Sequence, residues 1–258
     1  MNDTMNTLEQ SLHIRTWGQG ERILLIHGSN VDNPEMLWLH QQELASRYQL
    51  LLPDRRGYGL SPQSTDSQGF EQNIADIISL LGDGAHVVGH SYGGLLTMVA
   101  ASRVPQLVKS LTVIEPPAFG LTINQPEVLQ VVYKLQHVYQ TATTPEDFLI
   151  GFLRAMGNNL SGPLTISPQH RKGILTTMTE IEPWNITLHP QYLAGFQFPK
   201  LVVSGNWHPA LVNTADLLTE LLQADRLIIP NVGHDIQKTG KPFNNRLETL
   251  ITLAKTIK

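Results

Sequence analysis

A chain of 258 residues with 41% hydrophobic residues can form one large or two small domains with a substantial core. The net charge of −4 provides no basic field for nucleic acid, and the absence of cysteine excludes disulfides, thiolate nucleophiles and Cys-based zinc sites. No signal-peptide pattern opens the sequence, and no apolar run reaches the roughly 18 residues of a membrane span. We therefore expect a cytoplasmic protein that binds no nucleic acid and has no membrane span.

The first elements predict strands of a mostly parallel sheet. Residues Ser11–Trp17 alternate apolar and polar side chains, as a half-buried edge strand does. Arg22–His27 and Tyr48–Pro53 contain continuous apolar runs, which are typical of strands buried on both faces. Between them, Pro34 opens a predicted helix, since proline suits the first helical position.

The centre of the chain continues this alternation. Gly69–Leu81 has apolar residues at helical spacing and is followed by a glycine stop signal. Ala85–Val88 is a short apolar strand, and after a tight turn an apolar segment to Ala101 predicts a buried helix. Val108–Glu115 predicts another strand, which ends where two prolines prevent the hydrogen-bonded ladder from continuing.

From Ala118 to about Phe198 the strand signals stop, and Leu129–Tyr139 and Phe148–Met156 indicate helices. Because apolar residues recur throughout this segment, it predicts a helical insertion rather than a linker. Strand and helix signals then resume with a strand at Lys200–Ser204, a helix from about Ala210 to Leu222, a strand at Arg226–Ile229 and a closing helix within Asn244–Ile257.

This alternation predicts an α/β protein, with helices on both faces of a parallel sheet. Right-handed crossovers bring the carboxyl ends of the strands to one edge, where such sheets bind their ligands. The residues with reactive side chains that follow predicted strand ends are His27, Asp54, Ser91, Glu115, His208 and His234.

The turn Gly89-His90-Ser91-Tyr92-Gly93, between a strand and a helix, has the form of a nucleophile elbow. Such a turn forces its serine into a strained backbone conformation and lifts the hydroxyl above the sheet edge. Ser91 is therefore the predicted nucleophile.

A serine hydroxyl needs a base within hydrogen-bond reach. Of ten histidines, His234 is the best placed, because it follows the last strand, as the chain order serine, acid, histidine requires. We expect His90 to pack locally and His86 to be a core or helix-contacting residue. These two straddle a strand and its turn instead of sharing a helix with a glutamate, so we expect no catalytic metal.

Attack on a carbonyl produces an oxyanion, which needs preorganised backbone N–H donors worth roughly 3 kcal/mol each in the transition state. The N–H of Tyr92, directly after the nucleophile, is one predicted donor. The other is expected in the loop after the strand that ends at His27, and Ser29 is the residue we assign to it.

The acid that orients His234 is predicted to be Glu115. It ends the strand that follows the elbow helix, so it would lie on a neighbouring strand, and its side chain is long enough to reach the base. Three lesser candidates stay open: Asp216 within a helix, Asp235 adjacent to the base in sequence, and Asp54 on a more distant strand.

Four motifs occur together: His27-Gly28, Pro53–Ser61, Gly89–Gly94 and Gly233-His234. With them the chain resembles the α/β-hydrolase superfamily over nearly its whole length. The resemblance implies the α/β-hydrolase fold with an eight-stranded sheet, a helical cap inserted after the sixth strand, and a Ser-His-acid triad that uses no cofactor. We accordingly expect a hydrolase core formed by residues 1–117 and 199–258 and a cap formed by residues 118–198.

The chain departs from the family pattern at the acid. The family's usual aspartate after the seventh strand is missing, because His208 occupies its place in the loop Gly205–Pro209. A subset of the superfamily is similar to this chain in having an acid followed by Pro-Pro after the sixth strand, as in Glu115-Pro116-Pro117. This match favours Glu115.

Together these features predict a serine hydrolase that cleaves a carboxylic ester or related acyl bond through an acyl-enzyme. The aromatic residues of the inserted segment would supply an apolar roof, so the expected partner is a small to medium apolar substrate. A lyase or C–C bond hydrolase on the same fold, or a non-catalytic small-molecule-binding protein, stays open, since fold does not fix function.

Overall fold

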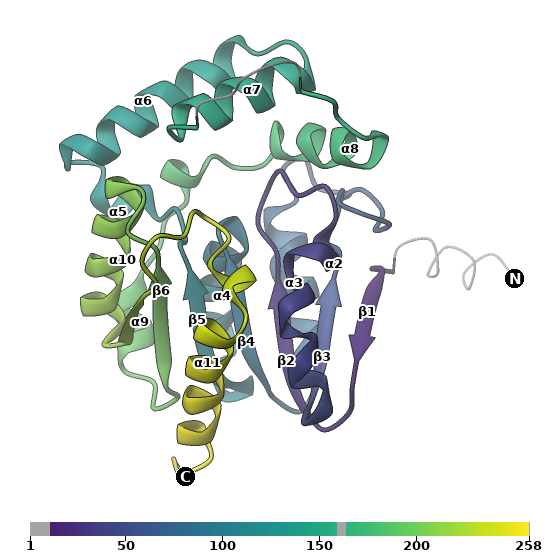
Figure 1. The fold of residues 1–258 in the computed structure, drawn as a ribbon, viewed down its shortest axis with the longest axis vertical. Helices are drawn as coiled ribbons and strands as arrows, with labels where there is room; N and C mark the ends of the chain where they lie inside the picture. Colours follow the sequence, from purple (N-terminus) through teal and green to yellow (C-terminus); the bar gives the residue numbers. More distant parts are fainter. Residues whose placement is uncertain (1–10, 159–163, 258) are drawn as a thin grey trace, which may run out of the picture.

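The computed structural model describes residues 11–158 and 164–257, which contain a seven-stranded sheet in the order β1-β3-β2-β4-β5-β6-β7 (Figure 1). Strand β1 pairs antiparallel with β3, and all other neighbours are parallel. The strands are β1 (Ile14–Trp17), β2 (Glu21–Ile26), β3 (Tyr48–Pro53), β4 (Ala85–His90), β5 (Val108–Ile114), β6 (Lys200–Ser204) and β7 (Asp225–Ile228).

The expected eight-stranded sheet is corrected to seven strands in the described residues. A single strand, β1, precedes β2 there. The chain turns at Gly18, where φ is +69°, and passes directly into β2. A Cβ atom at Gly18 would lie 2.1 Å from the carbonyl oxygen of Ala45, so this tight passage requires glycine. The expectation of no signal peptide rests on the first ten residues, which lie outside the described part.

The helices follow the predicted alternation. They are α2 (Pro34–Leu37), α3 (Phe70–Leu80), α4 (Tyr92–Arg103), α5 (Phe119–Thr122), α6 (Pro126–Thr141), α7 (Pro145–Ala155), α8 (Pro168–Thr177), α9 (Pro190–Ala194), α10 (Pro209–Leu222) and α11 (Lys241–Ala254). The helix predicted to open at Pro34 is short. It stops at Trp38, and Leu39–Ser46 continues as a 3₁₀ helix whose Gln41 amide donates to the Gln237 carbonyl and the Asn244 side chain.

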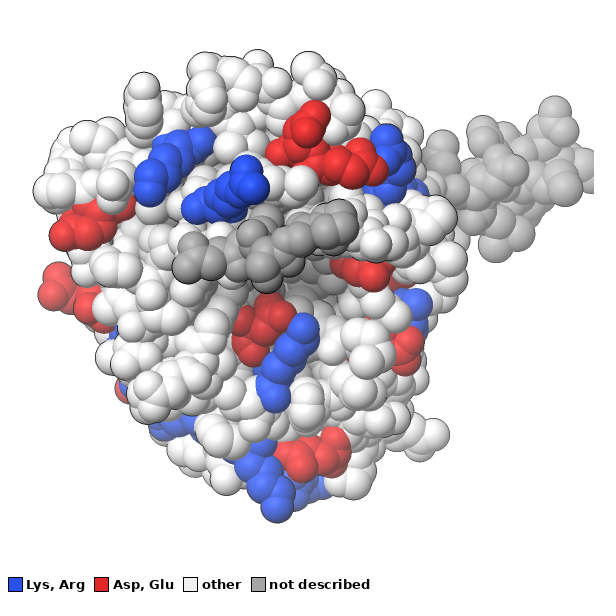
Figure 2. Space-filling view, turned by 45° about the horizontal axis from the view of Figure 1, so that its top comes forward, with Lys and Arg blue, Asp and Glu red and all other residues white. Residues whose placement is uncertain are grey.

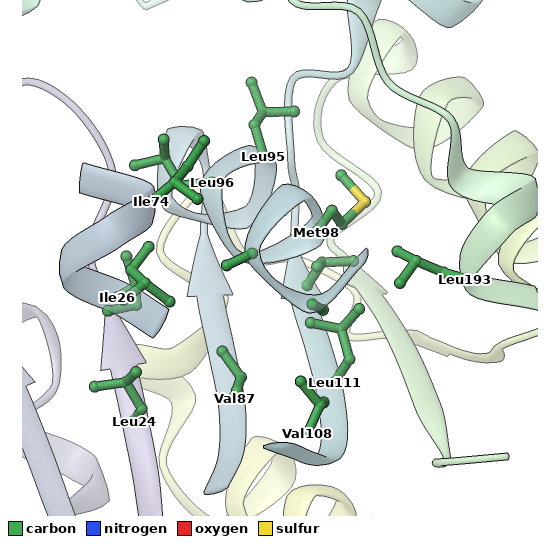
Figure 3. Packing of buried hydrophobic residues seen from close by; sticks show 14 of the residues in the cluster. Leu24, Ile26, Ile74, Val87, Leu95, Leu96, Met98, Val108, Leu111 and Leu193 are labelled. Atoms are coloured by element: carbon green, nitrogen blue, oxygen red, sulfur yellow. The ribbon is translucent and has the colours of Figure 1, made fainter. Parts of the chain in front are cut away.

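The core lies on both faces of the sheet, and β2 shows why its sequence is apolar throughout. Leu24 and Ile26 pack on one face with α3, α4 and α10. Figure 3 shows both side chains on the same side of the sheet as Ile74 of α3 and Leu96 of α4. Ile23 and Leu25 point to the other face, which α11 and the 3₁₀ helix cover. Both faces of this central strand are therefore withdrawn from water, as in other parallel sheets.

Helices α6, α7 and α8, hereafter the roof helices, lie across the carboxyl-terminal edge of the sheet (Figure 1). Helix α9, by contrast, packs beside the sheet, where Leu193 joins the same core cluster as α4. No helix in residues 11–158 and 164–257 is long and apolar enough to cross a bilayer.

Candidate active site

Ser91 sits at the junction of β4 and α4 in a backbone conformation that non-glycine residues rarely adopt, with φ +52° and ψ −126°. Such strain costs roughly 1–3 kcal/mol and persists only where the surroundings hold it. Here the Ser91 N–H donates to the carbonyl of Ile114 at 2.8 Å, and the Ser91 carbonyl accepts from the N–H of Gly94 at 2.8 Å. The nucleophile-elbow geometry expected from the sequence is present.

Glycines let the segment after β2 approach this turn closely. A Cβ at Gly28 would lie 2.7 Å from the Cβ of Ser91, and one at Gly93 would lie 2.5 Å from the carbonyl oxygens of Ile26 and His27. Distances below 3 Å are not accommodated between rigid groups, so both positions require glycine. The Gly28–Ser29 segment therefore lies directly beside Ser91.

The structure brings Glu115 and His234 together. The Nδ1 atom of His234 lies 2.7 Å from the Oε2 atom of Glu115, whose side chain is fully buried, whereas the His234 side chain is 32% exposed. Glu115 follows β5 at a positive φ of +42°, so a second strained residue stands at this sheet edge. A carboxylate can only accept, so Nδ1 carries the proton when Glu115 is ionised and Nε2 is left free to act as a base.

Two further donors hold the Glu115 carboxylate. The backbone N–H of Gly205 donates to Oε1 at 2.8 Å, and the indole Nε1–H of Trp207 lies 3.1 Å from Oε1 and 3.0 Å from Oε2. Hydrogen bonds of this kind are what a buried carboxylate needs to offset the loss of water. Sequence reasoning did not find Trp207, because the loop after β6 was searched for a carboxylate rather than for a donor to one.

The other candidate acids have other partners, and Asp235 also lies 3.8 Å from Nε2 of His90. Asp54 follows β3, which is separated from β5 by β2 and β4, and it accepts from Arg15 at 2.7 Å. Asp216 pairs with Arg226 at 2.9 Å, and Asp235 pairs with Lys238 at 2.6 Å. These contacts leave Glu115 as the carboxylate that is hydrogen-bonded to His234.

His90 was expected to pack locally, but it lies against His234. The two rings are 4.6 Å apart, and Nε2–H of His90 donates to the backbone carbonyl of His234 at 3.1 Å. Burial, together with the nearby His234, lowers the pKa of His90, so its ring is neutral at physiological pH. His208 directly precedes α10 and lies beside Trp207, and burial lowers its pKa as well.

The two residues predicted to donate to the oxyanion, Tyr92 and Ser29, have different surroundings. Tyr92 is the first residue of α4, so its N–H is one of the four at a helix start that lack an intrahelical acceptor. The Ser29 side chain is engaged, since its hydroxyl donates to Oε2 of Glu180. Both residues line one cavity with Ser91 and His234.

This cavity, of about 760 Å³, lies between the sheet edge and the roof helices. Its upper wall is mainly apolar, with Leu135, Tyr139, Phe152, Met156 and Trp184 among its residues. On the face shown in Figure 2, charged side chains of both signs are scattered, and most of the surface is uncharged. Within the described ranges no three His, Asp or Glu side chains converge as a metal site would need.

Comparison with known proteins gives a consistent assignment. A family model described as "Alpha/beta hydrolase family" matches residues 23–243. The chain is 26% identical over 241 residues to Lipase 3 of Moraxella sp., covering 83% of this chain and 72% of the lipase. It is 32% identical over 127 residues to the cis-3-alkyl-4-alkyloxetan-2-one decarboxylase of Shewanella oneidensis, covering 45% of this chain and only 38% of that protein's length.

Among solved structures, an alpha/beta hydrolase from Sphaerobacter thermophilus superposes with a TM-score of 0.68. Its sequence is 20% identical, and the superposition covers 93% of this chain and 95% of that one. At this identity the likeness concerns the fold alone.

Proposed function

Because this chain belongs to the alpha/beta hydrolase family, we propose that it is a serine hydrolase that cleaves carboxylic esters or related acyl bonds. Ser91 is the nucleophile, His234 the general base and Glu115 the acid that orients it. The observation that carries the proposal is the 2.7 Å hydrogen bond between Glu115 and His234 at a cavity that Ser91 also lines. The likeness to a lipase supports ester cleavage as the reaction.

The reaction has two halves. The Ser91 oxygen attacks the ester carbonyl carbon while Nε2 of His234 takes the hydroxyl proton, and Glu115 stabilises the resulting imidazolium through Nδ1–H. The tetrahedral intermediate then expels the alcohol, which receives the proton from His234 and leaves an acyl group on Ser91. Water, deprotonated by the same imidazole, attacks this acyl group, and the acid product leaves as Ser91 regains its proton.

The oxyanion of each tetrahedral intermediate accepts from the backbone N–H groups of Tyr92 and Ser29. Support for Tyr92 comes from its place at the start of α4, where the helix dipole also favours negative charge. Support for Ser29 comes from the close packing of the adjacent Gly28 against Ser91. Donors fixed in place before the reaction stabilise developing charge without reorganisation.

The proposed substrate is a small to medium ester with an apolar acyl or alcohol group. A cavity of about 760 Å³ has room for such a molecule, and the apolar side chains of the roof helices would remove it from water. We propose that residues 118–198 act as a cap over the core formed by residues 1–117 and 199–258.

The test is covalent labelling with a fluorophosphonate, followed by turnover of p-nitrophenyl esters of increasing acyl length. We expect labelling of Ser91, a rate maximum at short to medium chains, and a loss of roughly 10⁵–10⁶-fold in kcat for Ser91→Ala. Ser102→Ala is the matched control, because Ser102 lies on α4 but donates its hydroxyl only within that helix, to Val99. An unlabelled wild type, or a Ser91→Ala variant that keeps its activity, would overturn the proposal.

A further inference from the structure

Helix α8 and the residues after it lie along the segment from Ser29 to Asp32. The Ser167 hydroxyl donates to Asp32 at 2.5 Å, Nε2–H of His170 donates to the Asn30 carbonyl at 3.0 Å, and the Asn30 N–H donates to the Thr177 hydroxyl at 3.0 Å. The backbone of the segment beside Ser91 is thus held by a helix more than 130 residues away in the chain.

Three residues beyond α8, Glu180 forms a buried ion pair with Arg55. Nη1 of Arg55 lies 2.7 Å from Oε1 of Glu180, and the two side chains are 2% and 4% exposed. The other carboxylate oxygen of Glu180 accepts from the Ser29 hydroxyl. One carboxylate therefore joins the end of β3 to the segment after β2.

Arg55 uses its remaining donors on the same segment. Its Nε–H donates to the His27 carbonyl at 3.0 Å, and its Nη2–H donates to the Gly28 carbonyl at 2.9 Å. The Arg55 N–H also donates to Nε2 of His27 at 2.9 Å, so the proton of that imidazole is on Nδ1, which donates to the Gly28 carbonyl at 2.7 Å. The Gly28 carbonyl oxygen is held by two donors.

The guanidinium stays charged in this position. It lies over the rings of Tyr58 and Tyr92, at 4.6 and 5.3 Å from their centroids. Burial disfavours the charged form, but the Glu180 carboxylate together with Tyr58 and Tyr92 raises the pKa of Arg55. Loss of Glu180 would leave a buried guanidinium without its counter-ion, which favours movement of Arg55 toward water.

The orientation of one peptide unit connects this network to catalysis. The Gly28 carbonyl and the Ser29 N–H belong to the same planar trans peptide, so they point in opposite directions. Donors that fix the Gly28 oxygen therefore also fix the direction of the Ser29 N–H. Resting on the proposed function, we infer that Glu180 is a positioning residue that acts through Arg55 and the Ser29 hydroxyl to aim the Ser29 N–H at the oxyanion.

The test compares Glu180→Gln with Glu182→Gln. Glu182 lies two residues further along, is partly exposed and accepts from Asn185, so it is a matched control. For Glu180→Gln we expect kcat on p-nitrophenyl esters to fall about 10- to 100-fold with KM changed less than about threefold, because complete loss of an oxyanion donor costs about 10²–10³. A trifluoromethyl ketone, which forms a tetrahedral adduct with a serine, should bind more weakly by a similar factor.

A readout independent of turnover accompanies the kinetics. Hydrogen–deuterium exchange of the backbone amides in residues 27–31 should be faster in Glu180→Gln than in Glu182→Gln. Ser29→Ala removes one Glu180 contact and keeps the ion pair, so it serves if Glu180→Gln does not fold. It should lower kcat several-fold, leave KM unchanged and accelerate exchange of the same amides.

The outcomes separate the two proposals. A wild type that neither turns over esters nor reacts with the fluorophosphonate overturns the proposed function, and the inference with it. An active wild type whose folded Glu180→Gln variant matches Glu182→Gln in kcat and exchange overturns the inference alone. A Ser29→Ala variant with unchanged kcat and unchanged exchange also overturns the inference. So does a Glu180→Gln variant that loses kcat and thermal stability but binds the ketone as tightly as wild type.

Discussion

The two ends of the sheet each bring a histidine and a glutamate together, in opposite ways. At the carboxyl-terminal edge, Glu115 is fully buried, His234 is partly exposed, and the two are 2.7 Å apart. At the other end, His86 is buried, Glu21 is partly exposed, and the separation is 3.3 Å. The same residue types are present, but the buried partner is the acid in one pair and the base in the other.

The charges around each pair explain the difference. Glu21 also binds the ammonium groups of Lys109 at 2.9 Å and Lys255 at 3.1 Å, so its charge is already neutralised. His86 donates or accepts at Ser110, and burial lowers its pKa to about 4 although Glu21 opposes this shift. Glu115 has Trp207, a backbone amide and His234 as partners, so it can stabilise an imidazolium when one forms. A His–Glu contact alone therefore does not identify a catalytic pair.

The largest effect is expected from neutralising each of the two acids in turn. Glu115→Gln should lower kcat by about 10³–10⁴, because the amide cannot stabilise the imidazolium and can hold the wrong imidazole tautomer. Glu21→Gln should leave kcat within about twofold and lower the melting temperature, since it leaves two lysines without their carboxylate. Ester turnover and thermal unfolding of both variants measure these effects. Unchanged kcat in Glu115→Gln would rule out this residue as the acid.

A smaller effect is expected from Trp207→Phe, which keeps an aromatic ring but removes the indole donor to Glu115. The indole holds Glu115 in the way that neighbouring groups hold a metal-ligating side chain, and loss of such groups costs about 10–100-fold. We expect a decrease of about tenfold in kcat, with KM little changed. Steady-state kinetics on one p-nitrophenyl ester measure it. If KM rises and kcat stays constant, Trp207 serves only as a wall of the cavity.

The mildest test concerns the pair at the opposite end and uses pH. Between pH 6.5 and about 4 the unfolded chain takes up a proton at His86 that the folded protein does not, so stability should fall as pH decreases. Burial raises the pKa of Glu21, but Lys109 and Lys255 lower it to about 2, so a further loss follows between pH 4.5 and 2.

Urea unfolding at pH 7.5 and 4.5 measures the upper part of this range. Wild type should lose on the order of 2 kcal/mol more than His86→Gln between these two values. His137→Gln, at an exposed position on α6, should behave like wild type. Equal losses in wild type and His86→Gln would show that His86 is not held neutral by the fold.

The sequence predicted the parts of this molecule that depend on local pattern. Apolar runs located the strands, and the Gly-x-Ser-x-Gly turn located a strained Ser91, because these signals lie within a few neighbouring residues. The pairing of Glu115 with His234 was also predicted, because parallel strands place their carboxyl ends at one edge. The count of eight strands was inferred from resemblance and was wrong for the described residues.

Two other contacts between distant segments were not predicted. Arg55 and Glu180 are 125 residues apart, and Trp207 is 92 residues from Glu115. No periodicity or turn signal couples Arg55 to Glu180, since Glu180 follows α8 and this contact depends on how the roof helices pack on the sheet. Trp207 follows β6, which is adjacent to β5, but no sequence signal marks an indole as a donor to a buried carboxylate. Nothing in the sequence marked Glu180 as buried, because most glutamates face water.

The register of β4 and β5 has a consequence for the exchange of segments between relatives. His90 pairs with Ile114, so Ser91 and Glu115 leave the sheet one residue later on adjacent strands. Their separation is therefore set by the backbone ladder and not by the length of the chain that connects β5 to β6. A chimera could therefore take its roof from another family member and keep this spacing. If Glu180 positions the Ser29 N–H as inferred above, full activity of the chimera would also need a glutamate in the transplanted segment that reaches Arg55.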